Sequence, residues 1–114
     1  MHEIGIMSAA LTAVLAEASR HGARRVGRIV LRVGALSGAE PEALRFAFAA
    51  LSPGTPAAGA ALDIDTVAAR AHCPDCAADF EAGAGFVTEC PRCRRLCGDL
   101  RQGRELELAR VEMS

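Results

Sequence analysis

Residues 73–76 read Cys-Pro-Asp-Cys, and residues 90–93 repeat the same form as Cys-Pro-Arg-Cys. A Cys-x-x-Cys turn can bring two thiolates onto one ion, and a structural zinc site takes four ligands in a tetrahedron. The two pairs therefore predict a structural zinc site with four ligands, Cys73, Cys76, Cys90 and Cys93. Iron, redox-active dithiols or the absence of metal are the alternatives that this spacing leaves open.

A fifth cysteine makes the second pair ambiguous, because Cys93 and Cys97 could also form it. We favour Cys90 with Cys93, since the repeated Cys-Pro-x-Cys form gives two equivalent turns. Cys97 is then a spare thiol without an assigned role. His72 precedes the first pair, and we interpret it as a polar residue at the edge of the site rather than a ligand.

The segment around these cysteines, residues 70–103, is rich in glycine, proline and charge and has little hydrophobic periodicity. We predict that it is a zinc-ribbon-like insertion that is held by its metal rather than by an apolar core. The flanking residues, 1–69 together with 104–114, are predicted to form the main domain.

Hydrophobic patterns in the flanking residues predict two helices and two strands before the insertion. Apolar residues recur at helical spacing from Ile4 to Ala18, and β-branched residues from Val26 to Val33 indicate a buried strand. Pro41 follows Glu40 at a typical helix start, and an apolar stripe continues to Leu51. Residues 62–67 alternate as a strand does.

The last ten residues predict one more strand, in which Leu106 and Leu108 alternate with glutamates. The alternation then shifts to Ala109, which indicates a β-bulge. The expected fold is α+β, with two helices and a small three-stranded mixed sheet plus the zinc insertion. The first two strands, joined through a helix, should be parallel in a right-handed unit, and the last should add antiparallel.

Composition excludes several classes of function. All 13 basic residues are arginine, so a P-loop lysine and Schiff-base chemistry are absent. The net charge of −1 gives no general attraction to nucleic acids or anionic membranes. No apolar run approaches the roughly 20 residues of a membrane span, and no secretory signal is visible. We expect a cytoplasmic protein, in which paired cysteines bind metal rather than form disulfides.

His2 directly follows Met1, which places an amine, a backbone amide and an imidazole within reach of one ion. Ni²⁺ accepts such nitrogen-rich sets. Taken alone, however, a Met-His start is too short to be specific, and His2 would be interpreted as an ordinary surface residue.

The chain resembles the HypA/HybF family of hydrogenase maturation factors from end to end. The resemblance rests on three features: the start Met1-His2-Glu3, the two Cys-x-x-Cys pairs at their separation, and the stretch Val33-Gly34-Ala35-Leu36-Ser37 followed by Glu40-Pro41-Glu42-Ala43-Leu44-Arg45-Phe46. It continues through the closing residues 103–106. Gly5 departs from the family pattern, in which serine is frequent.

The resemblance implies a nickel metallochaperone rather than an enzyme. It would load Ni²⁺ into the large subunit of nickel–iron hydrogenase together with the GTPase HypB, without nucleic-acid or membrane partners. The implied nickel ligands are His2 and, with its backbone and carboxylate, Glu3, while the four paired cysteines hold zinc. Glu40 could approach the nickel or cap a helix. A zinc ribbon that binds nucleic acid or the transcription machinery is the alternative.

Overall fold

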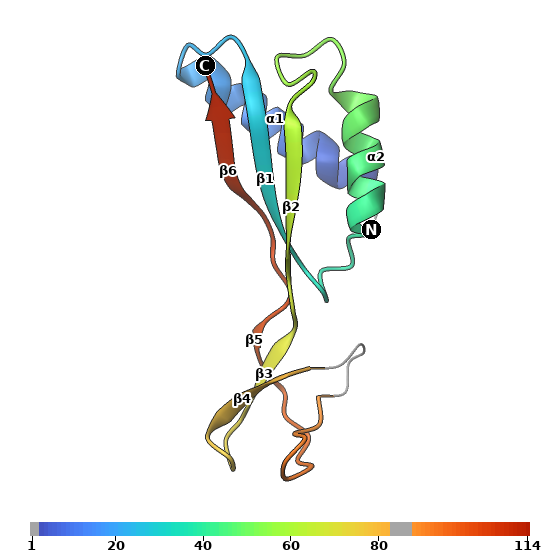
Figure 1. Ribbon diagram of the computed structural model, residues 1–114, viewed down its shortest axis with the longest axis vertical. Helices are drawn as coiled ribbons and strands as arrows, with labels where there is room; N and C mark the ends of the chain where they lie inside the picture. The colour runs from blue at the N-terminus through green and yellow to red at the C-terminus, as the bar shows by residue number, and fades with distance from the viewer. Residues whose placement is uncertain (1–2, 83–87) are drawn as a thin grey trace.

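The computed structural model describes residues 3–82 and 88–114. The chain is elongated, with extents of 54 × 24 × 17 Å and a radius of gyration of 17.4 Å, whereas a compact domain of this length would have about 13 Å. Two three-stranded sheets account for the shape, because they lie at opposite ends of the long axis (Figure 1).

The first sheet has the strand order β2-β1-β6 and carries both helices. Its elements are α1 (Glu3–Arg20), β1 (Val26–Gly34), α2 (Pro41–Leu51), β2 (Ala61–Val67) and β6 (Leu106–Met113). In Figure 1, α1 crosses behind the strands and α2 lies beside β2. This arrangement confirms the predicted α+β class with two helices and a mixed sheet.

Strand pairing in the first sheet follows the sequence patterns. β1 pairs in parallel with β2 and antiparallel with β6, as predicted. The register against β6 shifts at two points. One lies between Val26 and Arg28; at the other, Val30 lies opposite Arg110 and the next residue, Leu31, lies opposite Leu108. Ala109 is therefore the extra residue of a β-bulge, which confirms the break in alternation at this position.

One face of this sheet packs against both helices in an apolar core. Side chains from α1, β1 and α2 meet there at the spacing of a helical face and of a strand, and the fully buried ones include Met7, Val14, Val26, Ile29 and Leu44. This core stabilises α1 and α2, since most helical stability in proteins comes from the packing of an apolar face.

The second sheet has the order β4-β3-β5, with all neighbours antiparallel. Its strands are β3 (Arg70–Cys73), β4 (Ala78–Glu81) and β5 (Asp99–Gln102). Each has only four residues, which is too few for a hydrophobic period to be visible in the sequence. The antiparallel sheet agrees with the predicted zinc-ribbon-like insertion, while the exact domain boundaries at residues 70 and 103 stay a prediction.

Two glycines hold the connections between the sheets close together. Gly34 donates its N–H to the carbonyl of Glu105 at 2.7 Å, and Leu36 donates to the carbonyl of Gly103 at the same distance. A Cβ at Gly34 would collide with the Gly103 backbone, and one at Gly103 would lie 2.7 Å from the Cα of Ala69. Gly103 also has φ +124, which L side chains rarely adopt.

Candidate metal centre

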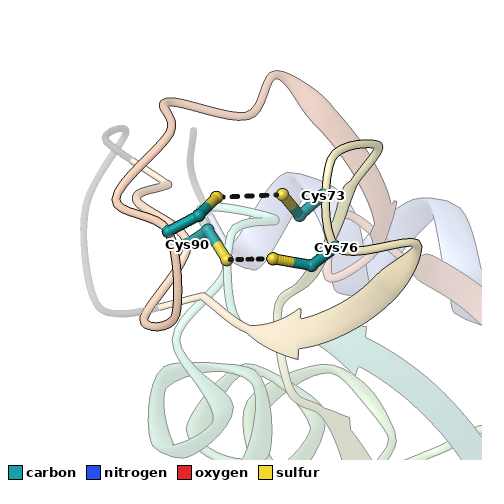
Figure 2. A group of neighbouring side chains, drawn as sticks. Cys73, Cys76 and Cys90 are labelled. Carbon is teal, nitrogen blue, oxygen red and sulfur yellow. Dashed lines mark hydrogen bonds between the residues drawn. The ribbon is translucent and has the colours of Figure 1, made fainter.

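Four thiols in and around the second sheet point toward one another. Cys73 is the last residue of β3, Cys76 lies in the turn to β4, and Cys90 and Cys93 lie in the segment before β5. All four sulfur atoms lie within 4.8 Å of one another. Figure 2 shows Cys73 and Cys76 facing Cys90 from a different part of the chain.

The sulfur–sulfur distances fit a metal tetrahedron. The Sγ atoms of Cys73 and Cys93 are 3.5 Å apart, and those of Cys76 and Cys90 are 3.8 Å apart. A zinc ion with four sulfurs at about 2.3 Å requires about 3.8 Å between sulfurs. The cluster therefore has the donor type and spacing of a tetrathiolate site, in which Cys73 and Cys90 are buried residues and Cys93 is an exposed one.

The first cysteine of each pair is prepared for the thiolate form. The backbone N–H of Cys76 is the main cause that lowers the pKa of Cys73 to about 6. The backbone N–H of Cys93 likewise lowers the pKa of Cys90. Each Cys-Pro-x-Cys turn thus directs amide N–H groups at its own first sulfur, which stabilises negative charge there.

The second cysteine of each pair has the opposite tendency. The hydrogen bond with Cys93, followed by burial, raises the pKa of Cys76 to about 12. The N–H of Arg95 acts to lower the pKa of Cys93, but contact with Cys73 and burial outweigh it and the pKa is raised. Without metal, the cluster at neutral pH therefore combines a thiolate acceptor, Cys73, with the thiol donors Cys76 and Cys93.

The two turns are equivalent in their backbone as well. The residue after each pair, Ala77 or Arg94, has a positive φ, of 51 and 64 respectively. Residues other than glycine adopt this left-handed backbone conformation at a cost of about 1–2 kcal/mol. The duplication seen in the sequence is thus a duplication of geometry.

An ion pair joins the two turns. Arg95 donates to Asp75 at 2.8 Å, and Asp75 belongs to the first Cys-Pro-x-Cys turn. Arg94 lies 3.9 Å from Glu89. Both pairs are largely exposed, so each contributes at most about 1 kcal/mol. The arginines also carry positive charge near a site whose four thiolates and one divalent ion would sum to −2.

His72 lies on the other face of β3 from Cys73, because successive strand residues point to opposite faces. Its Nδ1 is 2.7 Å from Asp79 on the paired strand, and this hydrogen bond is the main cause that lowers the pKa of Asp79. The ring is therefore outside the sulfur cluster, in agreement with its interpretation as a polar neighbour.

Cys97 is a buried neighbour of the site. It belongs to the same buried cluster as Cys73, Cys90 and Phe80, and its thiol donates weakly to the carbonyl of Arg95 at 3.4 Å. Burial, and then contact with Cys73, raise the pKa of Cys97.

The starts of the two helices meet beside the first sheet, away from the sulfurs of the second. Glu40 is the N-cap of α2, where its side chain accepts the N–H of Glu42 at 3.3 Å. Its own N–H donates to the carboxylate of Glu3 at 3.1 Å. The capping role weighed for Glu40 is confirmed. The prediction for His2 concerns a residue outside the described part of the chain.

Comparison with known proteins now identifies the family. The family described as "Hydrogenase/urease nickel incorporation, metallochaperone, hypA" matches residues 1–113. The chain belongs to the HypA family. The resemblance inferred from the sequence is thereby confirmed, and it places this chain among nickel metallochaperones and hydrogenase maturation factors.

Relatives and solved structures agree with this family. The hydrogenase maturation factors HypA of Chloroflexus aurantiacus and Chlorobium limicola are both 43% identical to the chain; the first match covers 98% of each chain, the second 97% of this chain and 95% of the relative. The solution structure of the nickel metallochaperone HypA from Helicobacter pylori has a TM-score of 0.66 at 25% identity, covering 99% of this chain and 97% of that one. A further HypA solution structure has a TM-score of 0.71, also at 25% identity, over 100% and 97%.

The HypA fold has site residues that sequence reasoning missed. The Asp75–Arg95 ion pair and the left-handed backbone of Ala77 have no visible signal in the sequence, although the repeated motif could have suggested equivalent backbones.

Neither helix of the described chain is long and apolar enough to cross a membrane.

Proposed function

We propose that this chain binds Ni²⁺ at His2 and delivers it to the large subunit during maturation of nickel–iron hydrogenase. The observation that carries the proposal is the HypA family match, which runs from residue 1 to residue 113 and so includes His2. Glu3 supports it from the described part of the chain, because this carboxylate lies in the first turn of α1 beside Glu40.

Nickel is cargo in this proposal, and its ligands must bind and release it. The imidazole of His2 supplies a nitrogen donor that Ni²⁺ accepts, and Glu3 assists with its backbone and carboxylate. Ligands near a chain end can leave the ion one at a time, so transfer to an acceptor needs no unfolding of the main sheet. Protonation of His2, with an ordinary pKa of about 6.5, weakens binding on acidification.

Zinc is the proposed resident metal of the four cysteines. Cys73, Cys76, Cys90 and Cys93 would hold it as thiolates in the tetrahedral geometry that the sulfur distances fit. With all four positions taken by protein, such an ion has no open position for substrate and serves to brace the fold.

The proposed partners are a HypB-type GTPase and the hydrogenase large subunit, in the cytoplasm. The chain contains no lysine, so GTP hydrolysis of the P-loop kind falls to the partner, and we assign no catalysis to this chain. Family membership and the even charge balance favour this function over the zinc-ribbon alternative, with no nucleic-acid or membrane partner.

The deciding experiment is a nickel titration of the untagged protein by isothermal calorimetry. We expect stoichiometric binding in the wild type, loss of binding in His2→Ala, and weaker binding in Glu3→Ala. Zinc content, measured in the same samples, should stay constant because the cysteines are unchanged.

His21→Ala is the matched control. His21 is an exposed histidine after α1 that bonds Glu17 at 3.0 Å, so its removal should leave nickel binding intact. Equal nickel affinity in wild type and His2→Ala would overturn the assignment of the nickel site. For delivery itself, purified large-subunit precursor should acquire nickel from the wild type and not from His2→Ala.

A further inference from the structure

Cys97 is a fifth thiol beside a site that needs only four. Its side chain is 4% exposed, against 0% for Cys73 and 2% for Cys90. These three cysteines share one buried cluster, and Cys76 packs against it. Cys97 is thus buried with two of the four ligands rather than isolated, although it is not one of the four sulfurs that lie within 4.8 Å of one another.

Backbone pairing fixes the direction of Cys97. Residues 88–90 run antiparallel to residues 95–97: Cys97 donates its N–H to Thr88 at 2.8 Å, Cys90 donates to Arg95 at 2.9 Å, and Glu89 bridges Leu96 between them. Opposite and diagonal residues of such a pair share a face. Cys97 and Cys90 therefore lie on the buried face, whereas Glu89 and Leu96 are exposed.

Cys93 is the proposed metal ligand that solvent and reagents reach most easily. It is the exposed member of the four, whereas Cys73 and Cys90 are buried and Cys76 is half-buried. One of its contacts within the cluster is with Cys73, at 3.5 Å between the sulfurs. Cys97, by contrast, is buried in the same cluster as Cys73 and Cys90 and follows Cys93 by only four residues in the chain.

We propose that Cys97 is a reserve metal ligand that completes the tetrahedron when Cys93 leaves it. In the exchange, the metal–sulfur bond to Cys93 breaks and a bond to Cys97 forms. The Cys97 thiol loses a proton and the departing Cys93 thiolate gains one, so the charge of the site and the number of thiolate ligands do not change.

Little opposes this exchange within the described part of the chain. The weak Cys97 hydrogen bond to Arg95, at 3.4 Å, is the polar contact that its sulfur must give up. Cys73 and Cys90 lie in the same buried cluster as Cys97, so its thiol starts near two of the ligands that would remain. The site would then keep its metal while its exposed ligand is modified or displaced.

Cobalt titration of the full chain tests the proposal, because Co²⁺ reports its thiolate ligands through visible and charge-transfer absorption. The proteins compared are wild type, Cys93→Ser, Cys97→Ser and the double variant. We expect Cys97→Ser, the matched control, to bind one equivalent with the wild-type spectrum. Cys93→Ser should keep the four-thiolate spectrum, and the double variant should lose one thiolate and at least about tenfold in affinity relative to Cys93→Ser.

Identical spectra and affinities for Cys93→Ser and the double variant would overturn the proposal. A second measurement avoids dependence on the folding of Cys93→Ser. Zinc-loaded wild type is treated with limiting iodoacetamide, and the singly alkylated protein is mapped and its zinc counted. Alkylation at Cys93 should leave one zinc bound in wild type and release it in Cys97→Ser; release from both proteins would refute the reserve ligand.

Discussion

The carboxylate of Glu3 accepts the backbone N–H of Glu40 at 3.1 Å, so the first turn of α1 is attached to the residue that caps α2. The Glu40 side chain is itself used, since it accepts the N–H of Glu42. Glu3, which we propose assists nickel binding, is therefore held in place by the start of α2. Its carboxylate in turn satisfies the backbone N–H of the residue that caps α2.

Replacing Glu40 by alanine should destabilise the protein by about 1 kcal/mol, because α2 loses its N-cap acceptor. Glu40→Asp keeps a capping carboxylate and should stay near wild type. Urea unfolding followed by helical circular dichroism measures both variants. Equal unfolding midpoints for Glu40→Ala and Glu40→Asp would show that the cap contributes nothing.

The main sheet could be predicted from the sequence because its elements are long enough to show a period. Both helices, the parallel pair and even the bulge at Ala109 follow from apolar spacing. The four-residue strands of the second sheet show no such period. The cysteine motif predicted their metal cluster, but cross-chain contacts such as Asp75–Arg95 arise from tertiary structure alone.

Gly103→Ala should destabilise the junction of the two sheets by about 1–3 kcal/mol, the usual cost of inserting a group into a closely packed place. The new Cβ would lie 2.7 Å from the Cα of Ala69, at a φ of +124. Gly5→Ala is the control, because no atom lies within 4 Å of its Cβ position and alanine favours α1. Thermal unfolding should therefore shift in opposite directions for these two variants.

Ala77→Gly should stabilise the metal-loaded protein by about 0.5–1 kcal/mol. Glycine removes the cost of the left-handed conformation but adds entropy to the unfolded chain. Ala78→Gly, one residue on in β4, should instead destabilise it, since no positive φ is relieved there. Denaturant unfolding of zinc-loaded samples compares them, and a loss of stability in both would contradict the strain at Ala77.

Metal affinity at the four cysteines should rise with pH. Without metal, the pKa of Cys73, about 6, favours its thiolate at neutral pH, and the pKa of Cys90 is lowered from its ordinary value, while the raised pKa values of Cys76 and Cys93 favour thiols. Binding all four as thiolates at neutral pH then releases at least the protons of Cys76 and Cys93, and below about pH 6 Cys73 must lose one as well. Zinc competition titrations from pH 5 to 8 measure the slope; a pH-independent affinity would contradict this proton count.

Removing the metal should unfold the second sheet and leave the first largely intact. The buried cluster of the second sheet consists of Ala71, Phe80 and three cysteines, so little apolar area replaces the metal when the thiolates lose it. The first sheet keeps an independent core of residues from both helices and β1. Hydrogen exchange after chelation should show fast amides in β3 and β4 but protected amides in β1 and α1. Simultaneous loss of protection in both sheets would show that they unfold as one cooperative unit.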